Sequence, residues 1–166
     1  MRAGIALGSN LGARLEMLRG ARARIERLPK TEAPILASAI YETAPVGCEP
    51  GAPAFLNAVI EIGYGGSAEE LLKQLREIEA TLGRPLEHAK NTSRTLDLDL
   101  LYFGDAAIRR PELELPHPRM HERRFVLQPL SEIRPELVLP AQTESVASLL
   151  ARLPETPPLL RQPSEW

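Results

Sequence analysis

The amino-acid sequence predicts an α+β fold, an antiparallel sheet with helices on one face. Short runs of apolar, branched or aromatic residues predict strands, and two longer segments repeat apolar residues every three or four positions, as amphipathic helices do. These segments alternate in the order strand, helix, strand, strand, helix, strand. With 166 residues the chain has the usual size of one domain, so we expect a single domain over residues 1–166.

The first half of the chain supplies one helix and two strands. Residues 4–7 predict a buried strand that ends in a glycine-containing turn at 8–10. Residues 11–28 predict a helix, because their apolar side chains share one face. Residues 35–41 predict the second strand, and residues 43–53, with five prolines and glycines, predict a long loop.

The second half repeats the pattern. Residues 55–62 alternate as a third strand, and Ser67 followed by Glu70 is a capping-box pattern that begins a helix reaching residue 82. A polar loop is expected before a fourth strand at residues 96–103. The resulting βαββαβ order is that of the ferredoxin-like fold, with both helices on one face and a ligand site on the other.

The C-terminal part lies outside this arrangement. A further helix is expected near residues 119–132, and spaced apolar residues between 146 and 153 predict a short one. Prolines are frequent after residue 153. We therefore expect residues 141–166 to form a short helix and a loosely ordered tail.

Composition excludes several classes of partner. The 20 basic and 22 acidic side chains leave a net charge of -2, which gives the chain as a whole no attraction to nucleic acid or to an anionic membrane. No apolar run approaches the 18 or so residues that a membrane helix needs. Cys48 is the one cysteine, which is typical of a reducing compartment. We expect a cytoplasmic protein without nucleic-acid or membrane partners.

The most informative segment is residues 94–101, Arg-Thr-Leu-Asp-Leu-Asp-Leu-Leu. Because side chains alternate along a strand, Asp97 and Asp99 lie on the same face, with Cα atoms about 6.6 Å apart. A divalent cation between two such carboxylates relieves their repulsion and attracts phosphate oxygens, so magnesium with a nucleotide is one interpretation. The other is a solvated strand edge whose aspartates pair with nearby arginines.

Basic residues flank the two aspartates on both sides. If they converge in space, arginine side chains can bind phosphate oxygens bidentately; if not, they are solvated surface. The chain has no Walker-type glycine-rich loop. The basic residues are Arg84, His88, Lys90 and Arg94 before the pair, and His117, Arg119, His121, Arg123 and Arg124 after it.

Five motifs together resemble the hydroxymethyldihydropterin pyrophosphokinase family. The similarity extends over about residues 4–140, and the Arg-Thr-Leu-Asp-Leu-Asp and Pro-His-Pro-Arg-Met segments are its most specific parts. The loop departs from the family pattern at Leu86, Asn91 and Thr92, and Pro118 replaces an aromatic residue. The motifs are residues 8–12 (GSNLG), 41–47 (YETAPVG), 55–58 (FLNA), 94–101 (RTLDLDLL) and 116–120 (PHPRM) with Arg123 and Phe125.

The resemblance implies transfer of pyrophosphate from ATP to 6-hydroxymethyl-7,8-dihydropterin by a cytoplasmic monomer in folate biosynthesis. It implies two Mg²⁺ ions, with Asp97 and Asp99 as ligands. The catalytic residues it implies are Arg84, Arg94, His117 and Arg123. Those for ATP are Glu79, Lys90, Leu100, Leu113, His117 and Arg123, and those for the pterin are Thr43, Val46, Phe55, Asn57, Asp97 and Phe125.

The alternative interpretation is a non-catalytic ferredoxin-like module that binds a partner or RNA on its open sheet face. Such a module needs exposed aromatic residues and a basic surface. Aromatic residues are 4% of this chain and its charge is balanced, which favours the enzyme.

Overall fold

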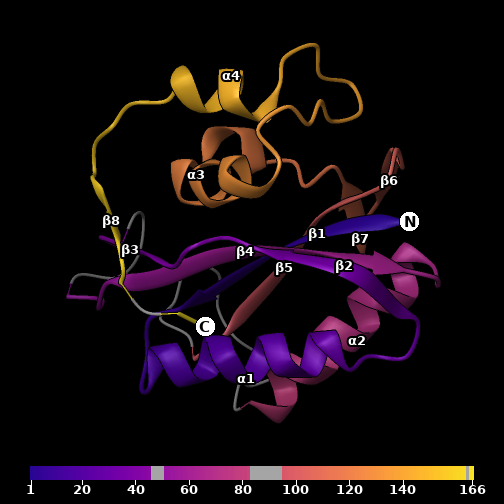
Figure 1. The fold of residues 1–166 in the computed structure, drawn as a ribbon, viewed down its shortest axis with the longest axis horizontal. Helices are drawn as coiled ribbons and strands as arrows, with labels where there is room; N and C mark the ends of the chain where they lie inside the picture. Colours follow the sequence, from indigo (N-terminus) through magenta and orange to yellow (C-terminus); the bar gives the residue numbers. More distant parts are fainter. Residues whose placement is uncertain (46–50, 83–94, 164) are drawn as a thin grey trace.

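A computed structural model describes residues 1–45, 51–82, 95–163 and 165–166. Its helices and strands follow one another along the chain as shown in Figure 1. The elements are β1 (Arg2–Ser9), α1 (Arg14–Glu26), β2 (Thr31–Ala37), β3 (Tyr41–Thr43), β4 (Phe55–Tyr64), α2 (Ala68–Thr81), β5 (Asp97–Phe103), β6 (Ile108–Arg110), β7 (Leu113–Leu115), the 3₁₀ helix η1 (Met120–Glu122), α3 (Arg124–Ile133), α4 (Val146–Ala151) and β8 (Leu159–Arg161).

The main sheet has the strand order β5-β1-β4-β3-β8, with β2 also paired to β4. All its pairings are antiparallel. Strand β4 is the longest; it pairs with β1 along one edge and with β2 and β3, one after the other, along its opposite edge. The predicted βαββαβ order is therefore present as β1-α1-β2/β3-β4-α2-β5, which confirms the α+β fold.

Helices cover both faces of the sheet. α1 and α2 lie on one face, and α3 and α4 are stacked on the other (Figure 1). The α1 residues Leu18, Ala21 and Ile25 are fully buried against the sheet, as their periodicity predicts. On the opposite face, α3 buries Leu127 and Leu130 against a second cluster that includes Val59 of β4. The face expected to be open is thus only partly open, because α3 packs on it.

The capping box at the start of α2 is confirmed. The Ser67 hydroxyl accepts from the Glu70 amide at 3.2 Å, and the Glu70 carboxylate accepts from the Ser67 amide at 3.1 Å. Each bond satisfies a backbone N–H that the first turn of a helix would leave without an intrahelical acceptor.

Residues 35–41, predicted as one strand, belong to two. β2 ends at Ala37 and β3 begins at Tyr41, with Ser38 between them. The Ser38 amide donates to the Val59 carbonyl, and the Ser38 hydroxyl accepts from the Val59 amide, both at 3.0 Å. A side-chain oxygen therefore replaces a backbone acceptor where the strand breaks, which residue periodicity does not reveal.

The region after β5 contains further strands and helices. β6 and β7 form a separate hairpin, and α3 and α4 match the two predicted C-terminal helices. Within the segment expected to form a loosely ordered tail, the three residues of β8 pair with β3. No helix in residues 1–45, 51–82, 95–163 and 165–166 is long and apolar enough to span a bilayer.

Candidate active site

The centre of the candidate site is a row of three residues across the sheet. Gly8 of β1 lies opposite Asn57 of β4 on one side and opposite Asp97 of β5 on the other. A Cβ atom at Gly8 would lie 3.4 Å from Asn57 Oδ1 and 3.9 Å from Asp97 Cβ. Because glycine has no side chain, a gap remains between an amide and a carboxylate.

Asp99 lies two residues further along β5 on the same face. It pairs in register with Ala6 of β1, and Leu98 and Leu100, which alternate with the aspartates, are buried in the core cluster that includes α1 and α2 residues. Asp97 and Asp99 therefore point to the face that carries α3, as strand alternation predicts. Both are partly exposed, and the Asp99 side chain keeps 36% of its surface accessible.

His117 and Arg123 approach the aspartates from the segment before α3. His117 Nε2 lies 4.0 Å and Arg123 Nη1 lies 3.7 Å from Asp99 Oδ2. The His117 amide donates to the Leu101 carbonyl of β5 at 2.8 Å, which fixes this segment beside the strand. Two residues of the second basic group, His117 and Arg123, thus lie beside Asp99 in space.

The imidazole of His117 is neutral at pH 7. Burial lowers its pKa, the charges of Arg123 and Arg119 lower it further, and the pKa falls to about 4. Nδ1 accepts from the Arg119 amide at 3.2 Å, so the proton of the neutral ring is assigned to Nε2. The ring therefore presents an N–H donor toward Asp99.

Asn57 has a fixed orientation. Its Nδ2 donates to the Thr43 hydroxyl at 2.8 Å in a buried contact that joins β4 to the end of β3. Since the amide nitrogen is held there, the carbonyl oxygen Oδ1 faces the gap over Gly8. Thr43 and Asn57, both expected at a pterin site, are thus coupled to each other.

The two phenylalanines expected to stack on a pterin come from two neighbouring layers, the sheet and the α3 helix layer. Phe55 begins β4 and lies opposite Thr43, on the same strand face as Asn57. Phe125 is in the first turn of α3, above that face, and the Arg123 guanidinium carbon is 5.6 Å from its ring centroid. Both rings are partly exposed.

The residues expected to contact the nucleotide lie at the outer strand β5. Glu79 of α2 accepts from the Leu98 amide at 2.7 Å, and β7, which contains Leu113, lies beside β5. The Leu100 and Leu113 side chains are buried in the core, so only their backbone can meet a ligand. Val46, Arg84, Lys90 and Arg94 lie outside the described residues, as do Leu86, Asn91 and Thr92.

The turn after β1 organises the site in a way that the sequence did not reveal. The Ser9 hydroxyl donates to the Thr95 carbonyl before β5, and Asn10 Nδ2 donates to the Pro53 carbonyl at 3.3 Å before β4. Arg14 donates to the Ala54 carbonyl at 2.7 Å. The 8–12 motif was the available signal, because short polar side chains in a turn often bond to nearby backbone.

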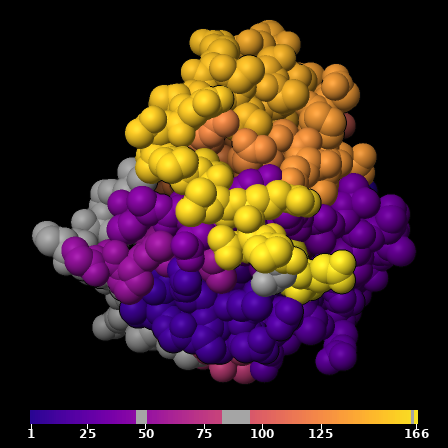
Figure 2. Space-filling model, turned by 60° about the vertical axis from the view of Figure 1, so that its left-hand side comes forward, coloured from indigo at the N-terminus to yellow at the C-terminus, as the bar shows by residue number. Residues whose placement is uncertain are grey.

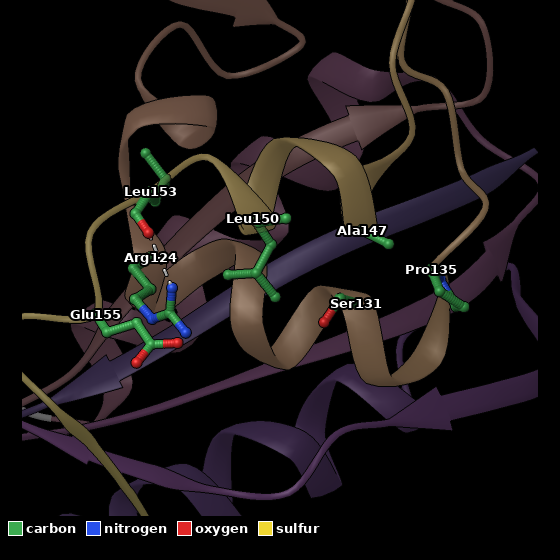
Figure 3. Close-up of a pocket in the computed structure, with 8 residues that line it drawn as sticks. Arg124, Ser131, Pro135, Ala147, Leu150, Leu153 and Glu155 are labelled. Carbon is green, nitrogen blue, oxygen red and sulfur yellow. Dashed lines mark hydrogen bonds between the residues drawn. The ribbon is translucent and has the colours of Figure 1, made fainter.

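A pocket elsewhere contains none of the expected ligand residues. It lies between α3 and α4, where Arg124 donates to the Leu153 carbonyl at 3.2 Å (Figure 3). Arg124 therefore points away from Arg123 and does not join the basic group at Asp99. The other lining residues are Ser131, Pro135, Ala147, Leu150, Ala151 and Glu155.

The acidic pair suits magnesium in the chemistry of its donors. Mg²⁺ prefers oxygen ligands and is commonly held by one or two carboxylates together with substrate phosphates. Asp97 and Asp99 supply two such carboxylates on one face. Within the part of the chain that the structure describes, no group of three or more His, Cys, Asp or Glu side chains is arranged to hold a metal.

A family model named 7,8-dihydro-6-hydroxymethylpterin-pyrophosphokinase (HPPK) matches residues 4–135, most of the chain. This chain belongs to that family. The match contains every candidate site residue that the structure describes, from Gly8 to Phe125. The pyrophosphokinase motifs noted in the sequence are therefore those of a true family member.

Curated relatives agree with this assignment. The 2-amino-4-hydroxy-6-hydroxymethyldihydropteridine pyrophosphokinase of Bacillus subtilis is 46% identical over 78% of this chain and 75% of its own length. The enzyme of the same name from Haemophilus influenzae is 41% identical over 82% of this chain and 83% of its own.

A solved structure supports the fold. Wild-type HPPK-DHPS of Plasmodium falciparum with pteroate superposes with a TM-score of 0.72 at 13% identity. The match covers 91% of this chain and 42% of that longer one. At this identity the likeness concerns the fold alone.

Proposed function

We propose that this chain transfers the pyrophosphoryl group of ATP to 6-hydroxymethyl-7,8-dihydropterin, giving the pterin diphosphate and AMP in folate biosynthesis. The observation that carries the proposal is the Asn57-Gly8-Asp97 row with Asp99, His117 and Arg123 beside it, in a chain that belongs to the HPPK family. A flat polar ring bound over Gly8 would lie between Asn57 and Asp97, with Asp99, His117 and Arg123 available for the phosphates.

The pterin would bind over Gly8. Asn57 Oδ1 would accept from a ring N–H, because Thr43 already holds the amide nitrogen. Phe55 and Phe125 would contact the two ring faces, and aromatic contacts of this kind favour flat ligands. We propose that Thr43, Val46 and Asp97 complete the pterin site.

Asp97 and Asp99 would hold two Mg²⁺ ions together with the ATP phosphates. Bound there, the ions would neutralise charge on the β- and γ-phosphates and orient them, which is the usual contribution of a metal to phosphoryl transfer. Glu79 and the backbone at Leu100 and Leu113 would contact the nucleoside. Lys90 would assist in binding the phosphates.

The chemistry is an in-line displacement at the β-phosphorus. The hydroxymethyl oxygen forms a bond to that phosphorus, the bond from phosphorus to the α–β bridging oxygen breaks with its electrons passing to AMP, and the hydroxyl proton is released. Arg123 and His117 would donate hydrogen bonds to phosphate oxygens as negative charge shifts from one oxygen to another during the reaction. We propose the same role for Arg84 and Arg94. The protein contributes position and charge complementarity.

We further propose that the enzyme acts in the cytoplasm as a monomer. The single cysteine supports a reducing compartment. Light scattering of the purified protein tests the monomer: a mass near 18.3 kDa supports it, and twice that mass contradicts it.

The test of the function is a product assay. Purified protein is incubated with ATP, Mg²⁺ and 6-hydroxymethyl-7,8-dihydropterin, and the nucleotides and pterins are separated. We expect AMP and pterin diphosphate in equal amounts, with none formed when Mg²⁺ is chelated. ADP with a pterin monophosphate would contradict pyrophosphoryl transfer, and folded protein that makes no product would favour the binding module.

A further inference from the structure

We propose that the C-terminal strap, residues 153–163 and 165–166, is a positioning element for the pterin site. It holds strand β3, so that Thr43 fixes the Asn57 amide. This inference rests on the proposed function, because it concerns the pterin site named there. The strap follows the region that the family model matches, which ends at residue 135, so family membership does not assign it a role.

The strap joins the two faces of the sheet. It begins at α4, where the Leu153 carbonyl accepts from Arg124, and crosses the edge of the sheet at β3 to reach α1 on the other face (Figure 1). In Figure 2 it forms a yellow ridge that runs from the α3–α4 layer across the sheet edge to the indigo N-terminal region. Its course passes directly beside the strand that ends at Thr43.

Strand β3 depends on the strap for its outer edge. In the register of the two strands, Leu159 lies opposite Thr43 and Arg161 lies opposite Tyr41. The Gln162 amide extends this ladder by donating to the Ile40 carbonyl at 2.9 Å. β3 has three residues, and a short strand without an outer neighbour would open locally at low cost.

The far end of the strap is anchored by Trp166. Its indole N–H donates to the Ser38 carbonyl at 2.8 Å, in the break between β2 and β3. Arg22 of α1 places its guanidinium carbon 5.2 Å from the ring and donates to the Trp166 backbone oxygen. The ring also packs against the main core. Cation–π, hydrogen-bond and apolar contacts thus fix this end.

The connection from the strap to the pterin site is short. Leu159 pairs with Thr43, the Thr43 hydroxyl holds Asn57 Nδ2, and Asn57 Oδ1 borders the gap over Gly8. The groups proposed for the nucleotide lie at β5, on the far side of β1 and β4. Loosening the strap should therefore weaken pterin binding and leave nucleotide binding nearly unchanged.

The test compares Gln162→Pro with Gln162→Ala. Proline removes the amide that donates to Ile40, whereas alanine keeps it and loses only a side chain that bonds within the strap, to the Leu160 carbonyl. Pterin dissociation constants are measured by calorimetry with Mg²⁺ and a non-hydrolysable ATP analogue present, and the analogue is titrated separately. We expect Gln162→Pro to bind the pterin about fivefold more weakly, the change expected for one lost hydrogen bond.

Trp166→Phe is a second variant, which keeps a ring and loses the N–H to Ser38. We expect the same selective weakening of pterin binding, so the test does not depend on Gln162→Pro folding. Equal pterin constants in the variants and in Gln162→Ala would overturn the proposal, as would equal weakening of pterin and nucleotide. Wild-type protein that binds no pterin would instead overturn the proposed function.

Discussion

Two acidic sites on the same face of the sheet, one at each end of α3, differ in how their carboxylates are used. At the C-terminal end, Glu61 of β4 is 1% exposed and accepts from Arg134, Arg2 and Tyr102. At the N-terminal end, Asp97 and Asp99 are partly exposed, and Arg123 approaches Asp99 to 3.7 Å. In both sites an arginine next to an end of α3 faces a sheet carboxylate.

The difference separates a structural site from the site that we propose binds metal and nucleotide. Burial alone would raise the pKa of Glu61, but hydrogen bonds from Arg134, Tyr102 and Arg2 outweigh it and hold the pKa below its usual value. The Glu61 carboxylate therefore stays charged and joins β1, β4, β5 and the end of α3. Asp97 and Asp99 are partly exposed, and Arg123 lies 3.7 Å from Asp99, an arrangement that suits the metal-binding role proposed for these carboxylates.

Replacing Asp97 should have the largest effect on turnover. We expect Asp97→Ala to reduce kcat by about a thousandfold, or about 4 kcal/mol in the activation barrier, since a metal ligand and its charge are lost. The midpoint of thermal unfolding should change little, because the side chain is partly exposed. Steady-state kinetics and calorimetry of the same preparation test both statements, and near-normal turnover would refute the role of Asp97.

Replacing Glu61 should reverse this pattern. Removing one partner of a buried ion pair costs about 3–5 kcal/mol, and the Arg2 and Arg134 side chains are 30% and 39% exposed, so we expect Glu61→Gln to lose about 2 kcal/mol of unfolding free energy. Turnover below the unfolding temperature should be nearly unchanged.

Chemical denaturation of Glu61→Gln beside Glu69→Gln provides the matched control. Glu69 pairs with Arg110 on the surface, where the side chains are 49% and 64% exposed, and exposed pairs contribute little. Equal stability of the two variants would show that the Glu61 network is not a structural site.

A methyl group at Gly8 should impair ligand binding with little change in stability. The added Cβ would meet its nearest atoms at 3.4 and 3.9 Å, distances that the fold tolerates, but it would occupy the gap proposed for the pterin. We expect Gly8→Ala to weaken pterin binding about tenfold, or about 1.4 kcal/mol. Gly20→Ala, in α1 and away from the site, is the control. Unchanged pterin affinity in Gly8→Ala would show that the pterin does not bind over Gly8.

The smallest expected effect is the loss of the Glu61 contribution in acid. Because the folded-state pKa is lowered from 4.5, this stabilisation is complete above that pH and is lost as the pH falls through the folded value. The stability difference between wild type and Glu61→Gln should therefore shrink below about pH 4.5. A difference that stays constant down to pH 3 would show that the charge of Glu61 is not its source.

Local sequence patterns predicted the helices, the capping box at Ser67 and the shared face of Asp97 and Asp99, because each depends on neighbours a few residues apart. The pairing of β8 with β3 was not predictable, since it joins Leu159 to Thr43 across more than a hundred residues. The gap at Gly8 follows from strand register, which the sequence of one strand does not specify.

Glu61 itself was not noticed in the sequence, where it is one charge in an apolar strand. Its partners Arg2, Tyr102 and Arg134 come from three distant segments. The motifs shared with the family suggested the candidate site residues, which stay a prediction, whereas the Ser9 and Asn10 contacts that position the neighbouring segments required the fold.

The most direct test of the central claim is the magnesium dependence of nucleotide binding. A non-hydrolysable ATP analogue is titrated by calorimetry into wild type and into an Asp97→Asn, Asp99→Asn double variant, with and without Mg²⁺. We predict that Mg²⁺ strengthens binding at least about tenfold in wild type and has no effect in the variant. A variant that keeps the full magnesium effect would contradict the assignment of the two aspartates as the metal site.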